Sequence, residues 1–282
     1  MPALSALAEA DLAALAGRAQ VGDRRALDDL VRAVADGIYN LAVRMLWHPE
    51  DAEDATQEIL VKLVTRLDSF RGEAAFTTWA FRVAANHLLT TRKRRAERNL
   101  TFEAFAADLA QGLADPREHG PDEGLLEEEV KIGCTQGMLL CLDREHRLAY
   151  VLGEVFALDS GRAATITGIT PAAFRKRLER ARSRLAAFMD GNCGIVNPAR
   201  PCRCRRRIDR AIERGRVAPE ALLFATHPRA DPAVRRAVVD MERLHAAAAL
   251  FRSHPDYRAP AALMEGIVRL VRSGRYELLG DG

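Results

Sequence analysis

The sequence predicts an all-α protein. Apolar residues recur at intervals of three and four along most of its 282 residues, which is the spacing of helices that bury one face. A hydrophobic content of 48% excludes wholesale disorder, and the length suits two or three small domains. Lysine and arginine outnumber acidic residues only by 42 to 39, so any role in binding nucleic acid depends on where the cations lie.

The chain shows no signal for export or membrane insertion. Glu9 and Asp11 interrupt its apolar start, and no basic segment precedes them. No apolar run approaches the roughly eighteen residues that a membrane helix needs. The chain has five cysteines, and an odd number does not fit the disulfide framework of a secreted protein. We therefore expect a soluble, cytoplasmic protein.

Two helices are predicted in the first third of the chain. Apolar positions from Leu27 to Met45 form one long amphipathic helix that ends near Trp47. A second helix follows at once, and its face opposite the buried stripe is acidic and polar, with Glu50, Asp51, Asp54, Gln57 and Glu58. Two interpretations are open: a solvated acidic face, or a docking face for a basic partner.

A third helix is predicted from about Phe76 to Arg95, after a loop that pivots at Gly72. On one face, spacings of three, four and seven residues align Trp79, Arg82, Asn86 and Lys93. Trp79 is either a core residue or a platform for an unpaired base, because stacking contributes roughly 1–3 kcal/mol per base while cations hold the strand. Residues 99–124 then lose the periodic pattern and read as an acidic linker that DNA would repel.

The second half of the chain contains a predicted helix-turn-helix. Helices resume at Leu125, and apolar residues from Leu139 to Leu152 form one amphipathic unit. A short segment near Ala163 precedes a glycine-containing turn, after which Thr170 caps a helix with proline at its first position. This order of elements is helix-turn-helix geometry, in which the second helix enters the major groove.

The second helix is strongly basic. Its inner stripe is Phe174, Leu178, Ala181, Leu185 and Phe188. A neighbouring arc of roughly 100° carries cations, in an ideal helix of 3.6 residues per turn: Lys176, Arg177, Arg180 and Arg184. The alternative is a generic basic amphipathic helix, which the capped start and the preceding helix make less favoured.

Three ordered motifs carry a resemblance to a known family. They are the segments 51–58 (DAEDATQE), 70–79 (FRGEAAFTTW) with Asn86, and 168–182 (GITPAAFRKRLERAR). Their order and spacing resemble the region-two and region-four signatures of bacterial extracytoplasmic-function sigma factors. The resemblance spans about residues 11–189.

The resemblance implies a role for each motif. The acidic helix would bind the clamp helices of RNA polymerase's largest subunit through Asp51, Asp54, Gln57 and Glu58. Unstacked bases of the minus-ten element would be held by Phe70, Arg71, Gly72, Trp79, Arg82, Asn86 and Lys93. The minus-thirty-five duplex would be read by Pro171, Ala172, Ala173, Arg175, Lys176, Arg177, Arg180 and Arg184.

The resemblance also implies a domain order. It places a region-two domain at 11–98, the acidic linker at 99–124, a region-four domain at 125–190 and a helical extension at 191–282. One departure concerns the first helix of the helix-turn-helix, residues 160–167, which lacks the glutamate-rich pattern common in the family and contains Gly161.

The extension begins with a loop rich in cysteine and arginine and continues with three or four short predicted helices. Cys193, Cys202 and Cys204 could ligate zinc if Cys134, Cys141 or a histidine supplied a fourth ligand. Their spacing is not that of the common structural zinc sites, so a redox-active thiol pair and merely structural cysteines stay open.

The whole pattern predicts a non-catalytic promoter-specificity subunit with core RNA polymerase and promoter DNA as partners, an anti-sigma factor as a further candidate partner, and no required cofactor. An autonomous helix-turn-helix repressor or activator is the alternative, and it would ordinarily dimerise on a palindromic site. An enzyme using a metal at the cysteines is disfavoured, because no activating acidic or histidine constellation accompanies them.

Overall fold

The computed structural model describes residues 4–91, 100–111, 113, 119–226, 248 and 250–272. These residues form helices joined by turns, without a β-strand, which confirms the predicted all-α class. The chain divides into two compact units. The N-terminal unit comprises Pro2–Arg92, Val151–Arg175 and Tyr257–Gly282, and the central unit comprises Lys93–Tyr150 and Lys176–Asp256.

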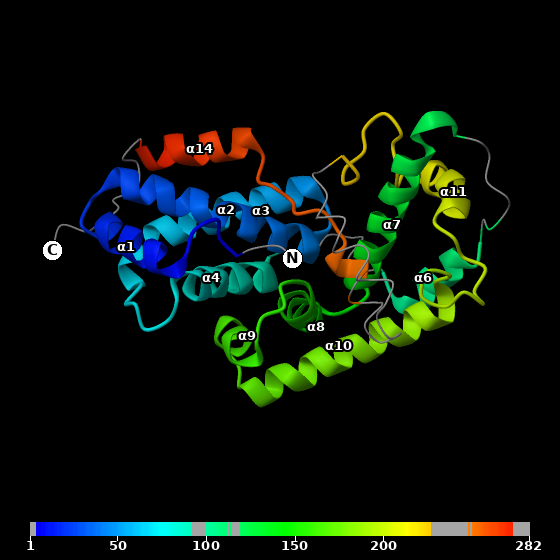
Figure 1. Ribbon diagram of the computed structural model, residues 1–282, viewed down its shortest axis with the longest axis horizontal. Helices are drawn as coiled ribbons and strands as arrows, with labels where there is room; N and C mark the ends of the chain where they lie inside the picture. The colour runs from blue at the N-terminus through cyan, green and yellow to red at the C-terminus, as the bar shows by residue number, and fades with distance from the viewer. Residues whose placement is uncertain are drawn as a thin grey trace. The chain divides into compact units, whose positions relative to one another are not determined.

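The N-terminal unit is a helical bundle (Figure 1). Its helices are α1 Glu9–Gln20, α2 Arg24–Leu46, α3 Pro49–Thr65, α4 Phe76–Thr90, α9 Ser160–Thr167 and α14 Ala261–Arg272. Asp23 caps α2, because its carboxylate accepts from the backbone N–H groups of Arg25 and Ala26, both at 3.0 Å. The two predicted helices of this segment are confirmed, whereas α4 ends at Thr90 and the predicted continuation to Arg95 lies outside the described residues.

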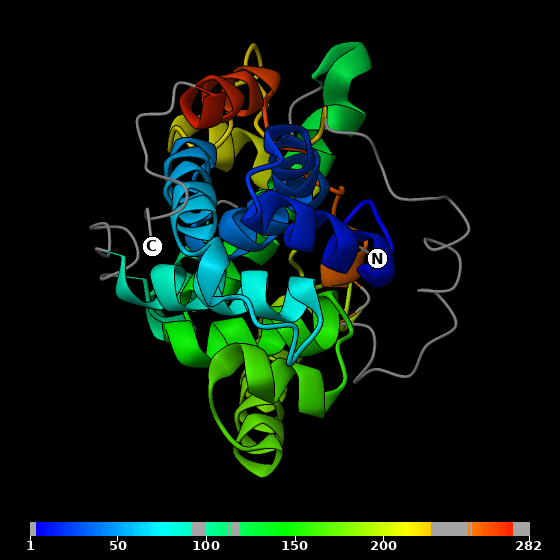
Figure 2. The same cartoon turned by 90° about the vertical axis from the view of Figure 1, so that its left-hand side faces the viewer.

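The C-terminal part of the N-terminal unit is held on α2 by a buried tyrosine. The amide oxygen of Asn40 accepts from the backbone N–H of Tyr257 at 2.8 Å, and the guanidinium of Arg44 lies 4.8 Å from the centre of the Tyr257 ring. Tyr257 and Arg44 are each only 1% exposed. From this anchor the chain enters α14, which packs along α2 and α3 (Figures 1 and 2).

The central unit contains α6 Phe102–Leu109, α7 Glu123–Leu140, α8 Arg144–Tyr150, most of α10 Pro171–Asn192, and α11 Ile208–Glu213. Part of the predicted acidic linker therefore folds, because Phe105 and Leu109 give α6 an apolar face that is buried. None of the helices in the described ranges is both long and apolar enough to cross a membrane.

The amphipathic unit predicted from Leu139 to Leu152 is not one helix. α7 ends at Leu140, α8 begins at Arg144, and a π-helix follows at Val151–Val155. The side chain of Arg147 is 1% exposed and donates to the carbonyl oxygens of Leu139 and Leu142, both at 2.9 Å. The buried guanidinium therefore gives hydrogen bonds to carbonyl oxygens at the end of α7 and just beyond it, where a helix leaves such groups without partners. These bonds reduce the free-energy cost of ending the helix here.

Candidate nucleic-acid interface

Three aromatic rings meet where the loop at Gly72 joins α4. The ring centre of Trp79 lies 5.6 Å from that of Phe70 and 5.5 Å from that of Phe76. Phe70 and Phe76 are buried, at 8% and 2% exposure, whereas Trp79 is partly exposed. One side of the indole is therefore supported by phenylalanines while part of its surface stays available. Phe70 belongs to this support and does not face solvent.

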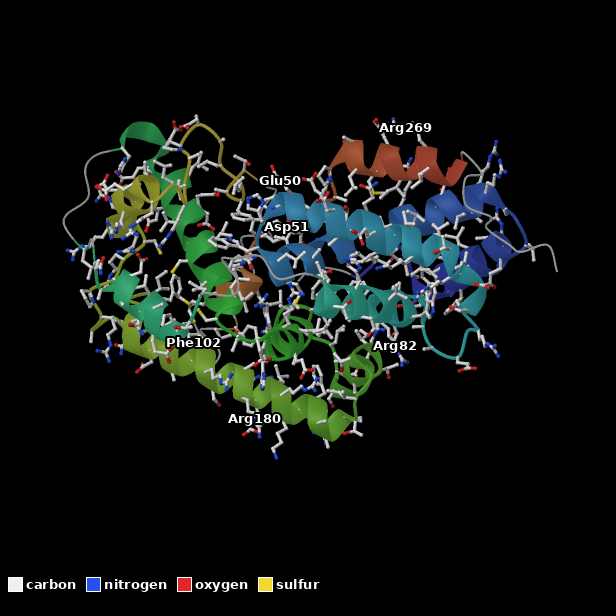
Figure 3. The ribbon with its side chains drawn as sticks, turned by 180° about the vertical axis from the view of Figure 1, so that it is seen from behind. Glu50, Asp51, Arg82, Phe102, Arg180 and Arg269 are labelled. Carbon is white, nitrogen blue, oxygen red and sulfur yellow. The ribbon has the colours of Figure 1, made fainter. Side chains whose placement is uncertain are left out.

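Arg82 and Asn86 extend this surface along α4. They follow Trp79 at spacings of three and seven residues, and both are exposed. Figure 3 labels Arg82 on this helix. In the preceding loop Arg71 is exposed, and Gly72 has a φ of 73°, a left-handed conformation that favours glycine. The remaining predicted residue, Lys93, lies outside the described residues. The structure thus brings Trp79, Arg82 and Asn86 together on one strip of α4.

A polar junction fixes the start of α4. The carboxylate of Glu9 accepts from the backbone N–H of Thr77 at 3.3 Å and also from its hydroxyl. Arg162 of α9 pairs with Glu9 at 2.8 Å and donates to the hydroxyl of Thr78 at 3.1 Å. A carboxylate at a helix N-terminus is favourable because unpaired N–H groups point at it. Sequence reasoning missed this junction, since 68 residues separate Glu9 from Thr77 and no local pattern connects them.

The acidic face of α3 is largely open. Glu50, Asp54, Gln57 and Glu58 are exposed and Asp51 is partly exposed (Figure 3). Burial and the neighbouring carboxylates of Asp54 and Glu50 raise the pKa of Glu53 above its ordinary value. Negative charge is therefore concentrated along this helix.

Glu58 has partners on α3 and α4 within the N-terminal unit. Its carboxylate lies 3.8 Å from His87 Nδ1 and 3.9 Å from Lys62 Nζ. Lys62 donates to His87 Nδ1 at 2.6 Å, which requires that nitrogen to be unprotonated. Burial, together with the charge of Lys62, lowers the pKa of His87 despite the opposing effect of Glu58. Asp54 and Gln57 are thus the better probes of an external docking role.

The predicted helix-turn-helix segment contains α9 and α10, joined by a turn at Gly168. Asp159 caps α9 by accepting from the N–H groups of Gly161 and Arg162 at 2.9 and 3.0 Å, which explains how a helix with glycine at its start is stable. Gly168 ends α9 with a φ of 68°. The hydroxyl of Thr170 accepts from the N–H of Ala173 at 3.2 Å, so the predicted cap of α10 is confirmed.

The two faces of α10 separate as expected. The inner stripe is buried, with exposures of 0–8% for Phe174, Leu178, Ala181, Leu185 and Phe188. On the outer side Pro171, Ala172, Ala173, Arg175, Lys176, Arg180 and Arg184 are exposed, and Arg177 is partly buried.

The cations of α10 are not equivalent. Arg177 pairs with Glu145 at 2.8 Å and Arg184 lies 3.8 Å from Asp143, both within the central unit. Arg175 donates to the hydroxyl of Ser160 at 3.3 Å. The described part of the chain provides no ion pair or hydrogen bond for the side chain of Arg180, which points away from the helix (Figure 3). Arg180 is therefore better prepared to meet DNA than Arg175, Arg177 or Arg184.

The three cysteines of the extension lie in the central unit. All are free thiols; Cys193 and Cys202 are buried and Cys204 is partly buried. Within the described ranges, no three His, Cys, Asp or Glu side chains are grouped so that they could hold a metal ion. A metal at these cysteines therefore stays a hypothesis at this point.

Comparison with known proteins identifies the family. The model of the sigma-70 region 2 family matches residues 15–99. The RNA polymerase sigma-H factor of Pseudomonas aeruginosa is 31% identical over 176 residues, which cover 61% of this chain and 90% of that protein. The extracytoplasmic-function sigma factor SigW of Bacillus subtilis is 30% identical over 169 residues, covering 58% and 89%. This chain belongs to the extracytoplasmic-function sigma factors.

Membership places the chain among RNA polymerase sigma factors, which act in transcription initiation and are not enzymes. A solved structure, that of CnrH in complex with the cytosolic domain of CnrY, aligns with a TM-score of 0.42 at 24% identity over 65% of this chain and 99% of that one. About two fifths of this sigma factor lies outside the alignments with the sigma-H factor and SigW.

Proposed function

We propose that this sigma factor binds core bacterial RNA polymerase, recognises minus-thirty-five and minus-ten promoter elements and promotes DNA melting. The observation that carries the proposal is the strip of α4 on which a partly exposed Trp79 lies with the exposed side chains of Arg82 and Asn86. A partly exposed indole beside a cation and an amide suits an unstacked base. A regulator that reads only duplex DNA has no use for such a strip, so it favours a melting function over the autonomous helix-turn-helix alternative.

For the minus-ten element, we assign base stacking to Trp79 and strand contacts to Arg71, Arg82 and Asn86. Phe70 contributes by supporting the indole, since its own ring is buried against Phe76 and Trp79. Gly72 lets the loop turn close to the bases, and Lys93, which lies outside the described residues, would add a cation to contact the strand. Extruding a base costs a few kcal/mol, which stacking and polar contacts offset.

For the minus-thirty-five element, α10 would enter the major groove with its capped end first. Arg180 and Lys176 would contact base edges, since a bidentate contact of a cation with guanine contributes about 1–3 kcal/mol of discrimination. Arg177 and Arg184 would first have to leave Glu145 and Asp143, so they suit phosphate contacts that tolerate looser geometry. Pro171, Ala172, Ala173 and Arg175 would line the entry to the groove.

Docking to the polymerase would use the acidic face of α3. Asp51, Asp54, Gln57 and Glu58 would meet basic side chains on the clamp helices of the largest subunit, and opposite charges would speed and orient the encounter.

The boundaries 11–98, 99–124, 125–190 and 191–282 stay the proposed domain limits. An anti-sigma factor is a further proposed partner, because it would have to compete only for exposed surfaces. Such a subunit would work in the cytoplasm and would need no cofactor for its activity.

The docking proposal is tested by adding positive charge at Asp54 and Gln57, whose side chains have no ion pair or hydrogen bond within the part of the chain that the structure describes. Asp54→Lys combined with Gln57→Lys adds repulsion to the proposed contact and leaves the Glu58, His87 and Lys62 cluster intact. Binding to core polymerase should weaken at least tenfold, whereas Glu220→Lys, also exposed, should bind as the unmodified protein does. Equal core binding by all three proteins would show that α3 is not the docking face.

A further inference from the structure

Four of the five cysteines lie on neighbouring segments of the central unit: Cys134 on α7, Cys193 directly after α10, and Cys202 and Cys204 just before Arg205–Arg207, which contacts α7. Leu126 and Val130 of α7 pack with Ile208, Ala211 and Val217, and Cys204 packs against this cluster. Cys134 follows Val130 by four residues, so it lies on the same stripe of α7, one turn further along. The stripe therefore directs Cys134 toward the segment that carries Cys204.

Cys193 and Cys202 approach each other through the backbone. Cys193 continues the end of α10, since its N–H donates to the carbonyl of Met189 at 2.8 Å. The backbone N–H of the next residue, Gly194, donates to the carbonyl oxygen of Cys202 at 3.1 Å. This hydrogen bond holds together the two ends of the loop between Cys193 and Cys202. A Cβ at Gly194 would clash with the backbone oxygen of Cys202, so this close approach requires glycine. Only Arg203 separates Cys202 from Cys204.

The electrostatics agree with this convergence. Burial raises the pKa of Cys134 well above its ordinary value, and the thiolates of Cys204, Cys202 and Cys193 add to the effect. Burial likewise raises the pKa of Cys204 to about 12, with further contributions from Cys193 and Cys202. The pKa of Cys141 is also about 12, but its causes are burial, Arg147 and Glu103 and include no other cysteine. These effects agree with Cys193, Cys202 and Cys204 lying near Cys134, whereas no other cysteine shifts the pKa of Cys141.

We propose that Cys134, Cys193, Cys202 and Cys204 bind a structural zinc ion. Four thiolates are a common ligand set of closed zinc sites, and buried thiols that repel each other when ionised gain most from a divalent cation among them. Because the side chains are not already grouped as a metal cage, binding draws them together while four thiol protons pass to solvent. The occupied site would carry a net charge of about −2, from four thiolates and one Zn²⁺.

The arginines of the loop suit this charge. Burial and Cys193 raise the pKa of Cys202, and the positive charges of Arg207 and Arg203 act in the opposite direction. Arg207 is 5% exposed and is held by Asp108 at 3.2 Å, so its position does not depend on the metal. The proposed ion would tie α7 to the end of α10 and to the start of the extension. This role is independent of promoter recognition, and its test does not use transcription.

The experiment compares the full chain with Cys134→Ser and Cys141→Ser. Each protein is reduced, its thiols are counted, and its zinc is measured after gel filtration; cobalt(II) is then added to metal-free protein. We expect about one zinc per chain and the absorption of a tetrahedral cobalt–thiolate site in the unmodified protein and in Cys141→Ser. Cys134→Ser should lose the retained zinc and the intense cobalt band.

Cys202→Ser provides a second variant in case Cys134→Ser does not fold, because Cys202 lies in a loop and Cys134 lies in α7. It should also lose zinc while circular dichroism shows its helices retained. Fully reduced protein that binds no metal would overturn the proposal, and so would equal zinc binding by Cys134→Ser and Cys141→Ser. Metal-free protein that carries a disulfide, detected as a mass lower by two hydrogens, would replace the metal site with a redox pair.

Discussion

Replacing Trp79 with alanine separates the two contributions of the indole. Toward the interior, the change removes ring contacts at 5.6 and 5.5 Å with Phe70 and Phe76. Each aromatic pair contributes about 0.5–1.5 kcal/mol, so the N-terminal unit should lose about 1–3 kcal/mol of unfolding free energy, before burial is counted. Toward solvent, it removes a stacking surface worth about 1–3 kcal/mol per base. The second loss corresponds to about 5- to 150-fold in open-complex formation.

The assay measures open complexes formed with core polymerase on duplex promoters and on promoters with a pre-melted minus-ten bubble. Trp79→Ala should be impaired on duplex DNA and should recover in part on the bubble, where the unstacking cost is reduced. Trp79→Phe keeps a ring and should fall between alanine and the unmodified protein. Denaturant unfolding must show that both variants are folded under assay conditions. Equal defects on the two templates would refute base stacking and assign Trp79 to the core alone.

Three further predictions concern α10, His87 and the C-terminal anchor. Arg180→Ala should weaken binding to the upstream promoter element by about 1–3 kcal/mol, and Arg184→Ala should weaken it less and mainly at low salt, as measured by fluorescence anisotropy across a salt series. Because the pKa of His87 is lowered in the folded state, unfolding free energy should fall as the pH drops below the unfolded value of roughly 6.5 and continue to fall through the lower folded pKa; His87→Asn should flatten this part of the pH profile. Tyr257→Ala should cost about 3–5 kcal/mol of unfolding free energy, since it empties a buried ring site under Arg44, and Tyr257→Phe should cost less.

The helices that the sequence predicted correctly depend on interactions between residues close together in the chain. The helices α2, α3 and α10 have periodic apolar stripes, and α2 and α10 also have capping side chains, those of Asp23 and Thr170. Both signals act between residues that are close in sequence. The exposed strip on α4 follows from spacing alone, because Trp79, Arg82 and Asn86 share a face in any helix. What spacing did not predict is how much of the indole would be covered, since that depends on Phe70 from the loop.

Contacts between distant segments account for the rest. The break between α7 and α8 is invisible in the apolar pattern, because the stabilising group is the buried side chain of Arg147 bonding to carbonyls before it. Glu9 capping α4 and Tyr257 anchoring on Asn40 join segments 68 and 217 residues apart. The acidic linker was predicted from its composition alone. Composition does not show that two apolar residues, Phe105 and Leu109, are enough to give α6 a buried face.

Promoter-dependent strand opening tests the central claim most directly. Core polymerase would be incubated with this protein on fragments of bacterial genomic DNA, and unpaired thymines would be mapped by permanganate reactivity. We predict reactive bases at defined sites only when polymerase and protein are both present, with loss of the signal in the Asp54→Lys, Gln57→Lys double variant. Sequence-specific binding of the protein alone to palindromic sites, with no association with core polymerase and no strand opening, would contradict the account.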